Sequence, residues 1–188
     1  MAWWGTKGAS DPTRKNRFLV EFGNGGMLLS VSSVTKPSVT IEKKEYKMIN
    51  HFYNYPGIPK WEPITIKFVD NKIWGSPEIG ADKSTAHVLY EMLVASGYVD
   101  PDKSATVRET IPVIGTSKAA MMDNSFGDGI ARIYQLDHEG KRSLENWELK
   151  NPIITKITWG ELDYGDDGLV EYNLEISYDY AVYTDTAT

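Results

Sequence analysis

The sequence predicts a mainly β protein in which two packed antiparallel sheets, arranged like a sandwich or barrel, carry one flanking helix. Three observations lead to this fold class. Several runs alternate apolar and polar residues with a period of two, as half-buried strands do. Aromatic residues make up 12% of the chain, led by 11 Tyr and 6 Trp, which suits pleated sheets. Only one stretch has helical spacing. A length of 188 residues fits a single domain over 1–188.

Composition excludes several classes of protein. The chain has no Cys, so disulfides, thiolate metal sites and a Cys nucleophile are ruled out. The N-terminal dozen residues lack the apolar segment of a secretory signal, and no run of 18 apolar residues exists, so we expect no membrane anchor. A net charge of −6 argues against nucleic-acid binding by phosphate neutralisation.

The N-terminal region reads as an irregular arm followed by a hairpin. Residues 1–15 mix Gly, Ser, Pro and charged residues and carry Trp3 and Trp4. These tryptophans either fold back on their own core or anchor on a neighbouring subunit, because Trp is a favoured interface anchor. Two strand-like runs, 17–22 and 27–34, flank a glycine-rich turn and predict a β-hairpin.

The next segments predict two strands around a loop. Residues 38–49 read as a strand, and 54–59 as a loop because two Pro and one Gly interrupt it. Residues 61–69 alternate again, with apolar side chains on one face.

One amphipathic helix is predicted over 84–96, with Asp82 or Ser84 as its N-terminal cap. Its apolar stripe has offsets 0, 3, 4 and 7 and consists of Leu89, Met92, Leu93 and Ser96. Gly97 stands where a helix-ending glycine is expected.

The middle of the chain is harder to interpret. Residues 98–128 show no clear period, and the turn cluster 123–129 has carboxylates at partial calcium-loop spacing. Tyr134 occupies the position where such a loop needs Glu, so calcium is not expected there. Three further strands are predicted, the first two as a hairpin: 130–136, 142–150 and 153–159.

The strongest pattern lies at the C-terminal end, where residues 170–182 alternate without interruption. One face carries Val170, Tyr172, Leu174, Ile176, Tyr178, Tyr180 and Val182. A strand of this length would span about 40 Å, well beyond an ordinary strand. It is therefore expected either to bend across two sheets or to pair along its length, including with another subunit.

The same region is acidic. The chain has no Lys or Arg after Lys156, but it has eight acids there: Glu161, Asp163, Asp166, Asp167, Glu171, Glu175, Asp179 and Asp185. Three of them, Glu171, Glu175 and Asp179, fall on the polar side of the last strand. This face is either simply solvated or a negative wall that, repeated around a ring, would repel a passing polyanion.

No catalytic, cofactor or metal site is predicted. The three histidines, His51, His87 and His138, have no metal-ligand spacing, and no nucleophile stands in a recognisable catalytic context. The chain is therefore expected not to be an enzyme.

Four segments, taken in order, resemble the tail tube proteins of contractile-tailed bacteriophages. They are NRFLVEF at 16–22, YPGIPKWEPITIKF at 55–68, the run 137–151 with Gly140, Trp147 and Leu149, and 153–183 ending in EYNLEISYDYAVY. Related tubes occur in type VI secretion and in phage-derived injection particles.

The resemblance implies a structural subunit that forms stacked, hexameric rings, a hollow conduit for DNA ejection inside a contractile sheath. It implies that the protein lies in the virion tail after assembly in the host cytoplasm. The implied partners are further copies of itself, the tail sheath protein, baseplate and tail terminator proteins, and genomic DNA that passes without specific binding.

The resemblance also locates expected contacts. A ring-stacking loop is expected at 43–59, and candidate subunit or ring contacts are Trp3, Trp4, Tyr53 and Tyr55. The candidate lumen face carries Glu171, Glu175 and Asp179.

Two alternatives remain open. One is the tube of an injection particle or secretion system that carries protein cargo. The other is a carbohydrate-binding β-sandwich, whose mark would be two or three exposed coplanar aromatic side chains.

Overall fold

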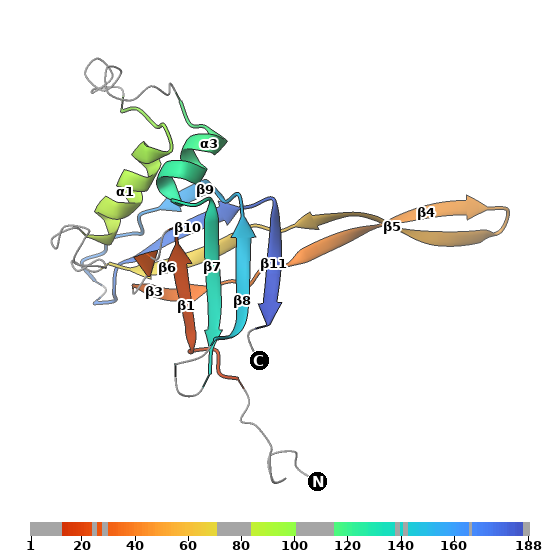
Figure 1. The fold of residues 1–188 in the computed structure, drawn as a ribbon, viewed down its shortest axis with the longest axis horizontal. Coiled ribbons are helices and arrows are strands. Elements are labelled where there is room, and N and C mark those ends of the chain that lie inside the picture. The colour runs from red at the N-terminus through yellow and green to blue at the C-terminus, as the bar shows by residue number, and fades with distance from the viewer. Residues whose placement is uncertain are drawn as a thin grey trace, which may run out of the picture.

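The computed structural model describes residues 13–23, 26–27, 30–70, 84–100, 115–137, 140, 143–165 and 167–185. Two antiparallel sheets pack on one another, and a long two-stranded ribbon projects from one of them (Figure 1). The predicted fold class, mainly β with two packed sheets and a flanking helix, is confirmed.

The first sheet has the strand order β11-β8-β7-β1-β2. Its members are β1 Phe18–Phe22, β2 Gly26–Met27, β7 Ile130–Leu136, β8 Ser143–Lys150 and β11 Tyr180–Asp185. The predicted hairpin of β7 and β8 is confirmed, because their antiparallel register runs from Ile130 opposite Lys150 to Leu136 opposite Ser143.

The second sheet has the order β3-β6-β10-β9. Its members are β3 Val31–Val34, β6 Ile64–Val69, β9 Ile153–Thr158 and β10 Glu171–Ser177. The predicted hairpin of 17–22 with 27–34 is therefore only partly correct. Gly26–Met27 pairs with β1, whereas Val31–Val34 pairs with β6 in the other sheet. A period of two shows that a segment is a strand but does not identify its partner.

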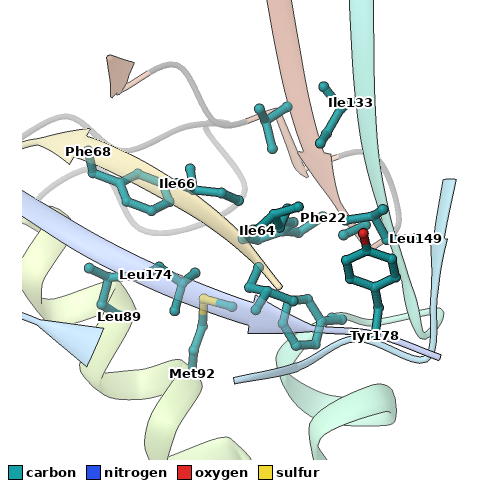
Figure 2. Close-up of a cluster of buried hydrophobic side chains, with 14 of the residues drawn as sticks. Phe22, Ile64, Ile66, Phe68, Leu89, Met92, Ile133, Leu149, Leu174 and Tyr178 are labelled. Atoms are coloured by element: carbon teal, nitrogen blue, oxygen red, sulfur yellow. The ribbon is translucent and has the colours of Figure 1, made fainter. Parts of the chain in front are cut away.

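The core lies between the two inner faces (Figure 2). The first sheet contributes Val20, Phe22, Ala131, Ile133 and Leu149, and the second contributes Ile64, Ile66, Phe68, Tyr172, Leu174 and Ile176. These residues alternate along their strands with more exposed neighbours, as a two-residue period requires. Burial of this apolar surface is the main stabilising contribution to the fold.

Helix α1, Thr85–Ala95, contributes Leu89 and Met92 to the same core, as the sequence predicts. The side chain of Ser84 caps it by accepting a hydrogen bond from the His87 backbone N–H at 3.3 Å. The backbone turns at Gly97, whose φ of 101° favours glycine.

The segment for which the sequence predicts no structure contains a short helical turn, α3 Lys118–Ala120, continued by η3 Met121–Ser125. It delivers Phe126 to the core, where its ring meets Phe22 edge-on with centroids 5.2 Å apart. Gly23 permits this approach: a Cβ at Gly23 would lie 2.7 Å from the Phe126 carbonyl oxygen.

Of the two alternatives for residues 170–182, the structure confirms the bend across two sheets. Strand β10 ends at Ser177 in the second sheet, and β11 begins at Tyr180 in the first. Tyr178 stays in the core at this crossing (Figure 2). The predicted apolar face does not continue past the bend, because Tyr180 and Val182 are exposed in β11 and Ala181 packs against the core instead.

The predicted loop at 54–59 is also wrong. These residues lie inside β5, His51–Trp61, which pairs with β4, Val39–Met48, to form the ribbon. Proline is tolerated because each strand of a two-stranded ribbon has a free edge. The register shifts between Ile41 and Lys43, and a Cβ at Gly57 would lie 2.7 Å from the Glu42 carbonyl oxygen. The proline and glycine residues thus mark a β-bulge.

The ribbon continues the β3–β6 pair beyond the sheet. Pairing runs from Val34 opposite Ile66, through the Glu62 N–H to Ser38 carbonyl bond of 3.0 Å, to Val39 opposite Trp61. One long hairpin therefore forms both a wall of the core and the projection (Figure 1).

The separation of core from ribbon makes a stability prediction. Leu174→Ala, at a fully buried position, should lower the free energy of unfolding by about 2–5 kcal/mol. Ile58→Ala, on the ribbon at 86% exposure, should change it by less than about 0.5 kcal/mol. Urea unfolding of the monomer measures both, and equal losses would contradict the separation.

Candidate functional site

The ribbon carries an exposed aromatic face. Cross-strand register places Tyr46 opposite Tyr53, Lys44 opposite Tyr55 and Met48 opposite His51, and opposed residues share a face. We call Tyr46, Met48, His51, Tyr53 and Tyr55 the aromatic face. Its three tyrosines are 46–60% exposed. The predicted contact residues Tyr53 and Tyr55 therefore lie together on one surface.

The opposite side of the ribbon is polar. We call Lys43, Glu45, Lys47, Phe52 and Asn54 the charged face. Lys43 forms an ion pair with Glu45, and the Lys47 ammonium lies over the Phe52 ring at 5.7 Å. The ribbon is thus amphipathic although neither side covers the protein core. Exposed contiguous apolar surface of this kind typically marks an interaction site.

Two predicted lumen acids lie on the outer face of the second sheet. Glu171 and Glu175 both belong to β10, on the side away from the core. The Lys67 ammonium is 3.8 Å from Glu171, and Lys156 stands opposite Glu175 in the register. Neighbouring strands therefore supply the cations that the C-terminal sequence lacks, and this face carries charges of both signs.

Asp179 lies apart from these two, at the corner where the chain passes between sheets. Its carboxylate accepts hydrogen bonds from the Lys118 ammonium at 2.6 and 2.7 Å and from the Asn151 amide at 2.8 Å. These bonds, Lys118 first, lower the pKa of Asp179. Asp179 joins α3 to the β8–β9 turn, so the three predicted acids do not form one continuous wall.

Sequence reasoning missed a network of charges on the outer face of the first sheet. Arg132, with a side chain 19% exposed, lies 2.9 Å from Asp128, 3.6 Å from Glu21 and 3.7 Å from Glu148. Burial and a hydrogen bond with Glu21 raise the pKa of Tyr134 to about 12. These residues come from β1, β7, β8 and the turn before β7, so only strand register brings them together.

The remaining candidates are less informative. Trp3, Trp4 and His138 lie outside the described residues. His87 pairs with Glu91 at 3.2 Å, and His51 stacks edge-on near Tyr53. Within the described part of the chain, no group of three or more His, Asp or Glu is placed to hold a metal ion. No helix in that part has both the length and the apolar character needed to cross a bilayer.

Comparison with solved structures shows which fold this is. The tube-terminating cap of the anti-feeding prophage matches with a TM-score of 0.61 and 15% identity, over 99% of this chain and 100% of that one. A chain of the sheath–tube complex of an extracellular contractile injection system, PVC, matches with a TM-score of 0.58 and 15% identity, over 93% of both chains.

A third match is a chain of the six-fold symmetrised baseplate of the anti-feeding prophage, with a TM-score of 0.58 and 14% identity, over 95% of this chain and 99% of that one. No protein-family model and no curated protein matches the sequence. The chain therefore shares its fold with components of contractile injection systems, which agrees with the resemblance found in the sequence.

The corner at Asp179 predicts a pH-dependent contribution to stability. Because its pKa is lower in the folded state, the contribution is present at neutral pH and is lost as the pH falls through the folded pKa. Asp179→Asn should cost up to about 1 kcal/mol at pH 7, since the pair is largely exposed, and less at pH 3.

Urea unfolding at both pH values measures this difference. Asp167→Asn, in an exposed turn, is the matched control and should have little effect at either pH. An equal cost of Asp179→Asn at pH 7 and pH 3 would contradict the electrostatic role.

Proposed function

We propose that this chain is a non-enzymatic structural subunit of the tube of a contractile, phage-tail-like particle. In this proposal its copies form six-membered rings that stack around a hollow conduit. The observation that carries the proposal is the ribbon, which places an aromatic face well away from its own core (Figure 1).

Tyrosine is enriched among residues that dominate interface energies, because it offers a large apolar area with a polar tip. The ribbon and the surface that receives it differ, so each copy can donate one contact and accept another. Contacts of this heterologous kind build rings or open-ended filaments rather than closed dimers.

The structures with the same fold suggest partners. They belong to a tube-terminating cap, a sheath–tube complex and a baseplate. We extend to this chain, as part of the proposal, contacts with a sheath, a terminator and a baseplate.

The proposed cargo is phage genomic DNA, with the particle assembled in the host cytoplasm and the tube placed in the virion tail. The net charge of −6 favours a wall to which a polyanion does not bind. Glu171 and Glu175 on the outer face of β10 are the proposed lumen residues, while the bonds of Asp179 favour a structural role for it. A protein-carrying injection particle is the second candidate, because the matched structures include a chain of an extracellular contractile injection system.

Replacing the aromatic face tests the assembly role. Tyr46→Ser, Tyr53→Ser and Tyr55→Ser combined should abolish rings and tubes in negative-stain electron microscopy at high protein concentration, because the buried area of the contact is lost. Urea unfolding of the monomer should change little, since the ribbon does not contribute to the core.

The control is the opposite side of the ribbon, where Lys43→Ser, Glu45→Ser and Asn54→Ser should leave assembly intact. Wild-type protein that stays monomeric even when seeded with tube fragments, and that binds on a glycan array, would favour the carbohydrate-binding alternative.

Charge reversal tests the proposed lumen. Glu171→Lys with Glu175→Lys should leave tubes intact but slow genome ejection, because a positive wall attracts the passing phosphates. The ejection rate of particles that carry the variant is the measurement. Unchanged ejection from intact tubes would reject the lumen assignment.

A further inference from the structure

The connection between β9 and β10 forms a hollow of about 480 Å³ at the surface. It is lined by Leu162, Tyr164, Leu169 and Val170, with Glu161 and Asp163 among them. Leu162 is 83% exposed, Leu169 is 76% exposed and Tyr164 is fully exposed. This short connection therefore exposes three large apolar side chains close together. Exposed apolar patches of this kind typically mark interaction sites, so we expect another molecule to cover them. We call this region the acidic hollow.

Its charge is uniformly negative. Glu161, Asp163 and Asp167 lie in the described part of this connection, all exposed, and the sequence has no Lys or Arg beyond Lys156. An occupant should therefore combine apolar side chains with positive charge.

The acidic hollow is held in place by the sheet. The Asp70 N–H donates to the Val170 carbonyl at 2.9 Å, which joins the connection to the end of β6. At the other side, Gly160 has a φ of 71°, and a Cβ there would lie 2.5 Å from the Glu171 carbonyl oxygen. The backbone thus packs closely against β10 at the start of the connection and bonds to β6 at its end.

The ribbon tip has the complementary chemistry. Ile49 is 83% exposed and sits at a φ of 53°, a costly backbone conformation for a β-branched residue. Met48 and Phe52, each more than half exposed, flank it. The ribbon as a whole carries four lysines against two glutamates, a net charge of about +2. Lys43 pairs with Glu45, and the Lys44 ammonium lies 3.8 Å from Glu42, so the excess positive charge comes from Lys47 and Lys60. Its tip is therefore an apolar knob on a positive stem.

Knob and hollow lie at opposite ends of the second sheet. The ribbon leaves next to Ile64, where β6 begins, and projects away from the sheets (Figure 1). The connection leaves next to Glu171, which is paired with Val69, where β6 ends. One copy therefore presents the knob at one end and the hollow at the other, a head-to-tail arrangement that can repeat from copy to copy.

We propose that the ribbon tip around Ile49 of one copy docks into the acidic hollow around Leu162 and Tyr164 of a second copy of this chain. The inference rests on the proposed function and deepens it by naming the surface that receives the ribbon. Apolar contact supplies the buried area. Attraction between the lysines of the ribbon and the carboxylates of the acidic hollow determines that the ribbon tip of one copy meets the hollow of the next.

Cysteine cross-linking tests the contact directly, because the chain has no Cys of its own. Ile49→Cys and Leu162→Cys are made as two separate variants, one tagged to change its mass, and are assembled together and oxidised. The disulfide-linked heterodimer should be the main product. Ile58→Cys with Leu162→Cys is the matched control, since Ile58 is 86% exposed on the same ribbon but away from its tip, and it should not cross-link.

The outcomes separate the two proposals. Tubes or rings without the Ile49→Cys to Leu162→Cys cross-link would overturn the inference and leave the proposed function standing. Absence of assembly under all conditions, seeded or not, would count against both.

A charge swap supplies a second readout in the same assay. Lys44→Glu with Lys47→Glu should strongly reduce tube formation, and adding Glu161→Lys with Asp163→Lys should restore it. Failure of the second pair to restore assembly would contradict the assigned charge pairing.

Discussion

The antiparallel pairing that begins between β3 and β6 continues without a break between β4 and β5, and the rest of the molecule depends on it. Inside the sheet this hairpin buries Ile64, Ile66 and Phe68 against the core. Beyond the sheet the same ladder exposes Tyr46 and Tyr53. Backbone hydrogen bonds hold the ribbon together, and its aromatic side chains stay largely exposed although His51 contacts Tyr53 and Lys47 lies over Phe52. The apolar area on the ribbon can become buried only by another molecule, which is the physical basis of the proposed assembly.

The second organising feature is the crossing of the chain from β10 to β11. Because Tyr178 stays in the core, one continuous segment contributes to both sheets and fastens them to each other. The corner is held by Asp179, whose carboxylate bonds to Lys118 and Asn151. An acid that seems free in the sequence is thus a structural residue. Strand pairing also places Lys67 beside Glu171. The charges around a residue therefore depend more on strand register than on its neighbours in the sequence.

Several elements were predictable because their signal is local. The alternation in 61–69 and the stripe of Leu89 and Met92 reflect burial of one face, which depends only on spacing along the chain. The strand at 54–59 was not predictable, because proline and glycine normally indicate a loop. They fit in a strand here because the strand has a free edge and a bulge, and both are features of the folded structure. The cluster around Arg132 was not predictable either, since it joins Glu21 and Glu148 from two other strands, and Glu21 lies more than 100 residues before Arg132 in the sequence.

The sequence by itself determined that the protein is mainly β, that one helix covers part of its core, and that its last segment has a face of acids and a face of apolar residues. These follow from periodicity and composition, which are properties of neighbouring residues. Only the tertiary structure decided that the last segment crosses between sheets, that Asp179 is separated from Glu171 and Glu175, and that the ribbon and the acidic hollow lie at opposite ends. Those facts depend on which strands pair and in which register, and pairing is a contact between distant residues that no local pattern encodes.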